Sequence, residues 1–347
     1  MNDLKQYQPK EVKQQLKPDR QLNMVRFSPC GKVLAAAGHD ATIRRWDAES
    51  FADLPAITGH GGWVQALAFH PDGQRLFAVD SWGKLACWPY ADKEAKPLWT
   101  VDQAHDGWVR GLALSSDGKT LATCGKDQLV RLWSDDGKKL SDLTGHDDDV
   151  LAVAIHPDGK SVVSGDLHGN VRQWDAATGK TTRTFDAKVL YRLDRLQDTG
   201  GVRVLAFNAD GTQLAVAGMT PKNGGSVQGV PTILLFDYAT GKLLHTMKVG
   251  NDGDGYVHDL HFHPAGFVMA VSSGNPGVGK FYFHQPGQEQ PFFTAAKPNC
   301  QSLAVHPNGT RLVISTTNGG SNGNGRQPGK DYPGNFSPLV VYDLPKT

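Results

Sequence analysis

The sequence predicts an all-β protein in which residues 1–347 form one domain of seven similar small sheets. Two observations carry this prediction. A turn that ends in glycine, typified by Phe-His-Pro-Asp-Gly at residues 69–73, recurs seven times, and in the first four copies an aromatic residue follows that glycine by 15 residues. A single sheet of three or four short strands cannot bury both faces, so each unit needs copies of itself as neighbours.

The stretch from Ala104 to Trp133 shows the plan of one unit. It contains, in order, a loop with His105, a strand at Val109 to Leu114, a tight turn at residues 116–118, a strand at Thr120 to Gly125, a turn at residues 126–128 and a third strand that ends at Trp133. Short strands of alternating apolar residues between turn residues are typical of an antiparallel meander.

The spacing of the turn glycines gives the size and number of the units. These glycines are Gly31, Gly73, Gly118, Gly159, Gly211, Gly266 and Gly309, separated by 42, 45, 41, 52, 55 and 43 residues. The spacing is close to the ~40 to 45 residues of a four-stranded repeat, with extra loop in two places. The third strands end at Trp46, Trp88, Trp133, Trp174, Phe236, Phe283 and Tyr342. The late units therefore carry their extra residues between the second and third strands.

These motifs resemble the WD40 repeat family. The resemblance rests on the Gly-His pairs at 59–60 and 145–146, the Pro-Asp-Gly turns, and the Trp-Asp pairs at 46–47 and 174–175, and it covers nearly the whole chain. It implies a seven-bladed β-propeller of four-stranded antiparallel blades around a central channel. The last blade would lack an outer strand, so we expect residues 10–17 to pair with it and close the ring.

Composition excludes several classes of function. With 36 basic and 35 acidic residues, the formal net charge is +1, which favours neither nucleic acid nor a membrane surface as a partner. No apolar run approaches the ~18 residues of a membrane span. We expect a soluble, monomeric, cytoplasmic protein, although a chain trimmed of its signal peptide would look the same. The cysteines at positions 30, 87, 124 and 300 are isolated and are interpreted as space-filling residues.

The resemblance implies a buried hydrogen-bond chain in each regular blade. In the third blade its members would be His105, Thr123, Asp127 and Trp133. The second and fourth blades are expected to break the pattern, because Trp82 and His168 occupy the position of Asp127. We therefore interpret His105 as a structural residue and expect no catalytic residue.

Two other patterns suggest metal binding on first inspection. His258, His261 and His263 form an HxxHxH string, but positions 258 and 261 face opposite sides of a strand, and His263 is a turn residue. The acidic segment 251–255 lacks the glutamate of a calcium loop, and the glycine string 319–330 lacks a phosphate-loop motif. We expect no metal and no cofactor.

One face of the propeller is the predicted partner site. Long insertions at residues 185–201, 219–232, 248–255, 273–279 and 316–338 should crowd this face. Trp63 and Trp108 precede inner strands, and Trp82 lies in a turn, where a large apolar side chain is typical of a binding hot spot. The alternative is that Trp63 and Trp108 only cap blade packing. The expected contact residues are Trp63, Trp82, Trp108, Asp106, Asp148, Asp149, Asp166, His168, Arg192, Arg195, Tyr256, Arg326, Lys330 and Tyr332.

These observations favour a non-catalytic scaffold that binds a peptide or protein. Tryptophan faces beside carboxylates would suit a cationic side chain of that partner. An enzyme of the hydrolase or lactonase type, with its site at the mouth of the central channel, is the alternative, since propellers host such activities too. A targeting module of a larger protein is a third possibility.

Overall fold

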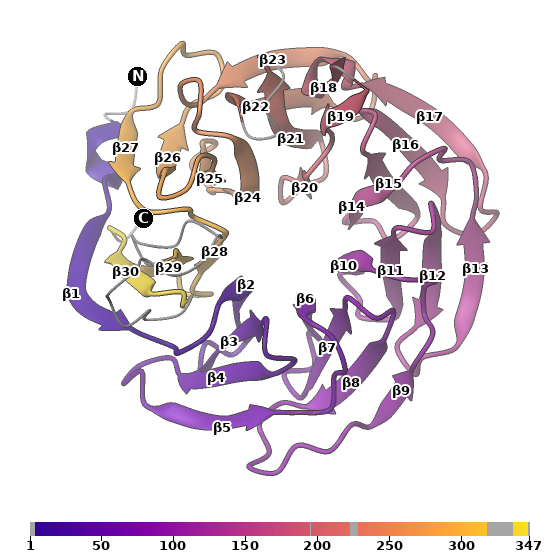
Figure 1. Cartoon of the computed structure of the whole chain (residues 1–347), viewed down its shortest axis with the longest axis vertical. Coiled ribbons are helices and arrows are strands. Elements are labelled where there is room, and N and C mark those ends of the chain that lie inside the picture. Colours follow the sequence, from indigo (N-terminus) through magenta and orange to yellow (C-terminus); the bar gives the residue numbers. More distant parts are fainter. Residues whose placement is uncertain (1–3, 195, 223–227, 318–335, 346–347) are drawn as a thin grey trace.

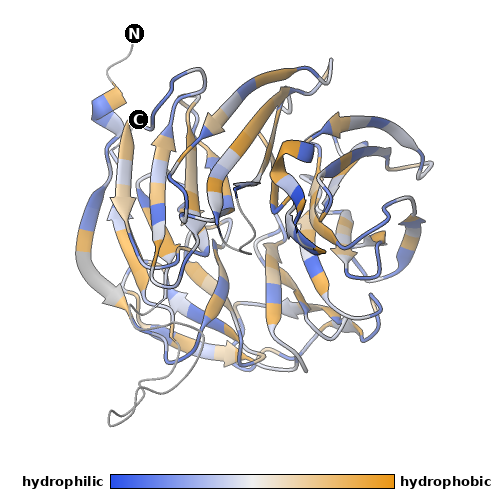
Figure 2. Ribbon diagram, turned by 45° about the horizontal axis from the view of Figure 1, so that its top comes forward, coloured by the Kyte–Doolittle hydropathy of each residue, from blue (hydrophilic) through white to orange (hydrophobic). Residues whose placement is uncertain are grey.

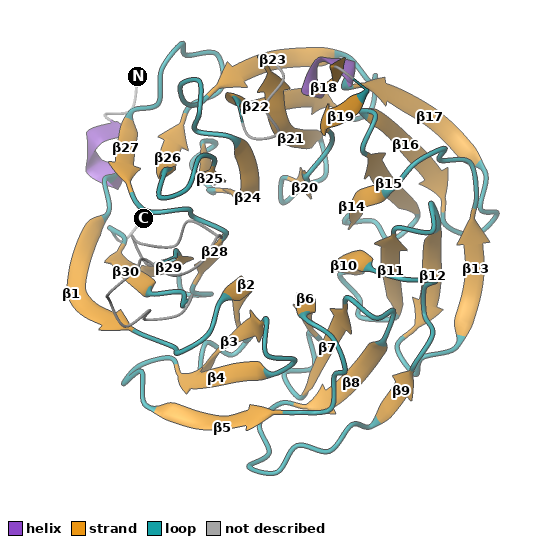
Figure 3. Ribbon diagram, viewed as in Figure 1, coloured by secondary structure: helices purple, strands orange, loops and turns teal. Residues whose placement is uncertain are grey.

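The computed structural model describes residues 4–194, 196–222, 228–317 and 336–345. Its strands form seven sheets of four antiparallel strands each, arranged as blades in a ring (Figure 1). Strands make up almost the whole ring (Figure 3). The predicted fold class and the number of blades are therefore confirmed.

The strand bounds follow the predicted repeat. From the inner to the outer strand, the blades are β2 (Leu22–Phe27), β3 (Val33–Gly38), β4 (Ile43–Asp47), β5 (Asp53–Ile57); β6 (Val64–Phe69), β7 (Arg75–Asp80), β8 (Leu85–Pro89), β9 (Trp99–Val101); β10 (Val109–Leu114), β11 (Thr120–Gly125), β12 (Val130–Ser134), β13 (Lys139–Leu143); β14 (Val150–Ile155), β15 (Ser161–Asp166), β16 (Asn170–Asp175), β17 (Thr181–Asp186); β20 (Val204–Phe207), β21 (Gln213–Pro221), β22 (Gly229–Asp237), β23 (Leu243–Lys248); β24 (Tyr256–Phe262), β25 (Val268–Ser273), β26 (Gly279–His284), β27 (Phe293–Ala296); and β28 (Ser302–Val305), β29 (Arg311–Ser315), β30 (Leu339–Asp343), β1 (Lys10–Leu16).

The N-terminal strand closes the ring, as predicted. Strand β1 pairs antiparallel with β30, and the register places Glu11 opposite Tyr342 and Leu16 opposite Leu339. The ammonium of Lys297 lies 2.7 Å from the Glu11 carboxylate, which adds an ion pair between β1 and blade six. The seventh blade thus joins the two ends of the chain.

The aromatic residue of each third strand anchors its blade. Trp46, Trp88, Trp133 and Trp174 are each at most 4% exposed, and Phe236, Phe283 and Tyr342 take their place in the last three blades. A buried aromatic side chain removes about 150–250 Å² from water, so these rings dominate the contacts between blades. Hydrophobic residues lie along the strands all round the ring (Figure 2).

The turns between first and second strands form the lower rim, and histidines connect them from blade to blade. His306 Nε2 lies 2.9 Å from the carbonyl oxygen of Gly31 in the first blade, and His156 Nε2 lies 3.1 Å from that of Gly211. A Cβ at Gly31 would lie 2.5 Å from the His306 ring, and Gly31 has a φ of +71°. Only glycine fits this contact.

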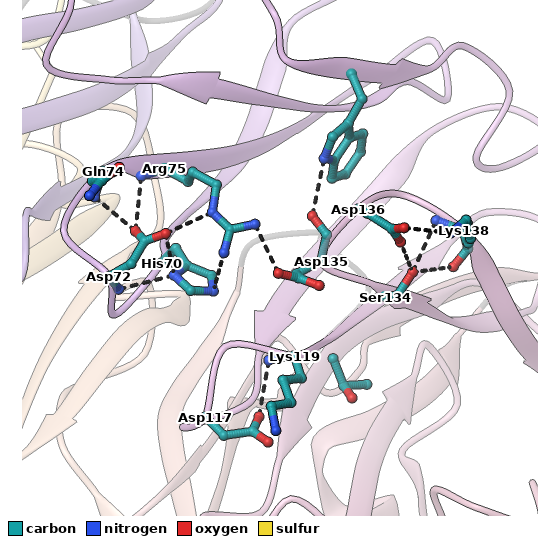
Figure 4. A network of polar contacts seen from close by, with 12 residues as sticks. His70, Asp72, Gln74, Arg75, Asp117, Lys119, Ser134, Asp135, Asp136 and Lys138 are labelled. Carbon is teal, nitrogen blue, oxygen red and sulfur yellow. Dashed lines mark hydrogen bonds and ion pairs between the residues drawn. The ribbon is translucent and has the colours of Figure 1, made fainter.

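An arginine on the lower rim joins blades two and three (Figure 4). The guanidinium of Arg75 lies 2.7 Å from Asp72 in its own turn and 2.9 Å from Asp135 in the next blade. Arg75 also contacts His70 Nε2 at 2.9 Å. Blades two and three are therefore held together by polar contacts as well as by their apolar cores.

Two of the predicted long loops are folded as strands instead. In segment 219–232, β21 and β22 extend the blade-five hairpin, with Pro221 opposite Gly229. In segment 185–201, the turn η2 (Lys188–Leu190) precedes a separate hairpin of β18 (Tyr191–Asp194) and β19 (Gln197–Gly200). Continued backbone pairing explains both differences. Most of the predicted loop 316–338 lies outside the described residues.

Candidate partner-binding surface

The upper rim lies at the other end of the strands from the lower rim. It consists of the turns between second and third strands and the connections that lead to the next blade. We define two groups of side chains on it: the tryptophan cluster (His39, Trp63, Trp82 and Trp108) and the histidine–carboxylate cluster (Asp148, His168, Tyr191 and Asp198).

The tryptophan cluster spans the first three blades. Trp63 stacks on His39 with ring centroids 4.5 Å apart and an angle of 2° between the planes, and it meets Trp108 edge-on at 5.7 Å. Trp63 remains 44% exposed. His39 Nε2 lies 2.5 Å from Asn23 Oδ1, which fixes the imidazole beneath the indole. Trp63 and Trp108 are thus in contact between blades two and three.

Trp82 is the most exposed tryptophan of the cluster, at 71%. Its ring nevertheless packs closely against the backbone of Gly61 and Gly62. A Cβ added at Gly61 would lie 2.7 Å from the indole, and one added at Gly62 would lie 2.9 Å from it. The Trp82 backbone N–H donates to Asp80 Oδ1 at 2.9 Å. One side of the indole therefore packs on glycine backbone while much of the ring faces solvent.

A cation already occupies one tryptophan face. The guanidinium of Arg110 lies 4.5 Å from the Trp108 ring centroid and 3.6 Å from the carboxylate of Asp149. Asp106 is exposed, and its backbone N–H donates to Asp127. Asp149 is therefore paired within the protein, whereas Asp106 presents its carboxylate to solvent beside Trp108 in the chain.

The histidine–carboxylate cluster lies on blade four and the inserted hairpin. His168 Nε2 is 3.1 Å from Asp148 Oδ2 and 3.6 Å from Asp198 Oδ1. The His168 ring also contacts the Tyr191 ring at 4.8 Å. All of these side chains retain some exposure. Asp148 and His168 were expected to contact a partner, and the structure places them against each other.

The third blade contains the hydrogen-bond chain that the resemblance implied. His105 lies 2.8 Å from Asp127 and 2.7 Å from Thr123, whose hydroxyl accepts a hydrogen bond from Trp133 Nε1 at 2.9 Å. Burial lowers the pKa of His105, although Asp127 opposes this effect. A buried, fully bonded imidazole has a structural role.

The fourth blade has the same hydrogen-bond chain as the third. The expectation that His168 breaks the pattern of this blade was therefore wrong. Asp166, two residues earlier, lies 2.8 Å from His146, and Ser164 bonds His146 and Trp174, each at 2.7 Å. The second blade is incomplete for another reason. Asp80 pairs with His60 at 2.9 Å, but Ala78 occupies the hydroxyl position.

Asp166 is therefore corrected from a partner contact to a structural residue. It is fully buried, and its carboxylate accepts hydrogen bonds from the backbone and side-chain nitrogens of Asn170 at 2.8 and 3.0 Å. Burial alone would raise the pKa of Asp166, but the hydrogen bonds from His146 and Asn170 outweigh it and lower that pKa. A side chain in this position cannot reach a partner.

The other expected contact residues make separate contacts or lie outside the described residues. Arg192, at the inserted hairpin, donates to the carbonyl oxygen of Lys222, whose side chain pairs with Asp252. Tyr256 lies beneath the guanidinium of Arg203, 4.6 Å from ring centroid to Cζ. Positions Arg195, Arg326, Lys330 and Tyr332 lie outside the described residues.

The HxxHxH string does not converge on one point. His263 stacks on Phe267 at 4.2 Å on the lower rim, whereas His258 and His261 belong to the inner strand β24. His258 is half-buried, whereas His261 is exposed, and desolvation lowers the pKa of His258. In the acidic segment 251–255, Asp254 pairs with Lys280 at 2.6 Å. These observations agree with the structural interpretation of both segments.

Sequence reasoning missed His39 and Asp198. His39 follows a glycine at the end of a second strand, and nothing in its spacing indicates that Trp63 of the next blade stacks on it. Asp198 lies in a segment interpreted as a loop. Asp80 and Asp166 had a visible signal, because each is followed three residues later by glycine, at Gly83 and Gly169.

Comparison with known proteins agrees with the repeat. The family model for the WD domain, G-beta repeat, matches residues 13–47, 53–88, 95–134 and 137–175. No helix in the described part of the chain is long and apolar enough to cross a membrane.

Several relatives are similar over parts of their length. The chain is 24% identical to Periodic tryptophan protein 2 of Arabidopsis thaliana over 364 aligned positions. This alignment covers 86% of the chain and 39% of that protein. It is 26% identical to Nuclear distribution protein PAC1-2 of Uncinocarpus reesii, over 49% of this chain and 43% of that protein. For Nuclear distribution protein nudF 1 of Talaromyces marneffei, the identity is 26%, over 53% of this chain and 45% of that protein. The chain thus spans 39–45% of the length of these relatives. The first half of the chain thus contains four matched WD40 repeats, and the seven sheets form a seven-bladed β-propeller.

Proposed function

We propose that the protein is a non-catalytic interaction scaffold that binds a peptide or protein on its upper rim, with a cationic side chain of the partner against the tryptophan cluster. The single observation that carries this proposal is Trp82, which is 71% exposed and yet seated on glycine backbone. An exposed aromatic ring held in place loses little conformational freedom on binding, and this is typical of a hot spot.

The preference for a cation rests on a contact within the protein. Arg110 already lies over the Trp108 ring with Asp149 as its counter-ion. Trp82 and the exposed Asp106 offer the same two components on neighbouring turns, because a Cβ added at Gly83, the residue after Trp82, would lie 2.3 Å from the carbonyl oxygen of His105, the residue before Asp106. A cation over an indole gains about 0.5–1 kcal/mol at an exposed site, and more when it is desolvated. An arginine or lysine of the partner would complete this second arrangement.

The propeller suits this role because binding residues are often carried by loops on a rigid framework. A cytoplasmic location and a monomeric state stay predictions.

An enzyme at the centre of the ring is less well supported. Asp259, a carboxylate on the inner strand β24, already accepts hydrogen bonds from Arg26 at 2.8 Å, Ser302 at 2.6 Å and the backbone N–H of Leu303 at 3.1 Å. It therefore has little capacity left to act as a general base.

The proposal is tested with peptides selected from a random display library against the full chain. The selected peptides should contain arginine or lysine at a recurrent position. The double variant Trp82→Ala, Trp108→Ala should weaken their binding at least tenfold, measured by fluorescence anisotropy, with the melting temperature nearly unchanged.

Leu140→Ala is the matched control, because Leu140 is 57% exposed on an outer strand, away from the upper rim. This variant should bind like the unchanged protein. Asp106→Asn should weaken binding less than the double variant does. If the double variant binds normally, the tryptophan cluster is not the site. If it loses much of its stability instead, the tryptophans serve blade packing, as the alternative interpretation holds.

A further inference from the structure

We propose that Asp148, His168 and Asp198 form a binding site for one divalent transition-metal ion, and that Zn²⁺ fits this site best. The three side chains come from three separate segments of the chain. Asp148 lies before β14, His168 in the turn between β15 and β16, and Asp198 on β19 of the inserted hairpin. The inference is independent of the proposed partner contact at the tryptophan cluster.

The distances between the ligand atoms match those of a metal site. His168 Nε2 lies 3.1 Å from Asp148 Oδ2 and 3.6 Å from Asp198 Oδ1, and the three candidate ligand atoms all lie within 4.8 Å of one another. Zinc bonds of about 2.0–2.2 Å at a tetrahedral angle place neighbouring ligand atoms about 3.4 Å apart. The two distances from His168 lie on either side of this value.

The donor set favours Zn²⁺ over magnesium or calcium. Imidazole nitrogen and carboxylate oxygen are both ligands of zinc, whereas the alkaline-earth ions prefer oxygen ligands alone. The side chains of His168, Asp148 and Asp198 are 34%, 27% and 39% exposed. An ion held by them would be open to solvent, so water or a ligand from another molecule could complete its coordination.

The ligands also have the supporting contacts that metal sites need. The Tyr191 hydroxyl donates to Asp198 Oδ1 at 2.7 Å, and its ring lies 4.8 Å from the His168 ring. Tyr191 therefore orients one carboxylate and restricts the imidazole at the same time. Hydrogen bonds of this kind to ligating groups typically change metal affinity by about 10–100-fold. The hydrogen bond to Asp198 also raises the pKa of Tyr191 to about 12.

Backbone contacts fix the distances between the three segments. The N–H of Leu167 donates to the carbonyl oxygen of Asp149 at 3.0 Å, which sets the His168 turn against the Asp148 loop. At the base of the inserted hairpin, a Cβ added at Gly201 would lie 2.9 Å from the Leu167 backbone. The N–H of Val202 donates to the carbonyl oxygen of Asp166 at 3.0 Å. The cluster therefore does not depend on long flexible side chains.

Two carboxylates in such proximity repel each other unless a positive charge lies between them. A metal ion bound to His168 Nε2 between the two carboxylates would supply that charge, and its binding would be saturable.

The experiment uses the full chain with the substitution Cys30→Ser, because Cys30 is an exposed thiol that could bind zinc. After treatment with a chelator, the protein is titrated with zinc sulfate in a calorimeter. We expect one equivalent to bind. His168→Gln and Asp198→Asn should each weaken binding at least tenfold, and Tyr191→Phe should weaken it about tenfold through the lost hydrogen bond.

Asp147→Asn is the matched control, since Asp147 is an exposed carboxylate next to Asp148. This variant should bind zinc like the parent. Circular dichroism and melting of each metal-free variant show whether the propeller stays folded. Co²⁺ offers a second readout, because a tetrahedral site with nitrogen and oxygen ligands gives visible absorption without thiolate charge-transfer bands. The proposal is overturned if no saturable binding occurs, or if His168→Gln and Asp198→Asn bind as tightly as Asp147→Asn.

Discussion

The indole Nε1 of Trp88 and the imidazole Nε2 of His60 are both buried without a hydrogen-bond partner among the described residues, although their rings lie only 4.8 Å apart. In blade four, the equivalent rings of His146 and Trp174 lie 5.9 Å apart, and the Ser164 hydroxyl bonds both. Blade two has Ala78 at that position. The absence of one hydroxyl leaves two buried polar atoms unsatisfied.

Ala78→Ser should therefore stabilise the protein. The new hydroxyl can accept from Trp88 and bond His60, and we expect a gain of about 1 kcal/mol in the free energy of unfolding. The reverse change in blade four, Ser164→Ala, should cost about 2 kcal/mol, because it leaves two groups unpaired. Unfolding of each variant in urea measures these two changes in the free energy of unfolding. A loss of stability in Ala78→Ser would mean that the closer rings leave no room for the oxygen.

Asp72 should make stability depend on pH in the acid range. Burial would raise its pKa, but hydrogen bonds from the Gln74 backbone and from Arg75 outweigh burial and lower the pKa to about 2. Because the folded pKa lies below the unfolded value of 3.8, the stabilisation is present above about pH 4 and is lost as the pH falls through about 2.

Asp72→Asn removes this stabilisation. We expect a loss of about 1 kcal/mol at pH 7, since the side chain is partly exposed, and almost no difference from the unchanged protein near pH 2. Unfolding by urea at both pH values measures the effect. A difference that stays the same at both pH values would show that the ionisation of Asp72 is not its cause.

Ring closure depends on β1. Deletion of residues 1–17 removes the outer strand of the last blade and exposes the edge of β30. The melting temperature should fall sharply, and a synthetic peptide of residues 8–17 should restore part of the loss when it is added. A deletion variant that melts like the full chain would contradict this closure.

Asp259 connects three inner strands, since its carboxylate bonds Arg26 on β2 and Ser302 on β28. Asp259→Asn removes the charge that balances Arg26, and we expect a cost of about 3 kcal/mol. In the double variant with Arg26→Met, the cost should be smaller than the sum of the two single losses, because the partners interact directly. Additive losses would exclude this coupling.

The sequence was sufficient for the fold because the repeat depends on local requirements. Each turn needs a glycine at positive φ, as at Gly31, and each third strand needs a large aromatic residue, as at Trp133. Both requirements can be recognised in the sequence, because the glycine and the aromatic residue recur at a fixed spacing. The pairing of residues 10–17 with the last blade followed from the count of strands, since one blade lacked its outer strand.

The candidate sites could be predicted only in part. The tryptophans were visible because a large apolar side chain is unusual in a turn. The role of Asp166 was missed although Gly169 follows it by three residues, because Asp166 stands two positions before the residue that aligns with Asp127 and reaches the imidazole of His146 only through the geometry of the strand end. Asp198 could not be connected to His168 either, because the hairpin β18–β19 had to fold back on blade four first.

The histidines of the lower rim make the seven seams between blades unequal. An imidazole lies against the turn glycine at three seams, through His70 and Gly118, His156 and Gly211, and His306 and Gly31, whereas a Cβ added at the turn glycines Gly73, Gly159, Gly266 and Gly309 would meet no atom within 4 Å. Among the described residues, blade six neither supplies nor receives such an imidazole, because His263 stacks on Phe267 within its own turn. We expect hydrogen exchange at the lower rim to be fastest on both sides of blade six. Local opening of the propeller should therefore begin there, one blade away from the joint that closes the chain.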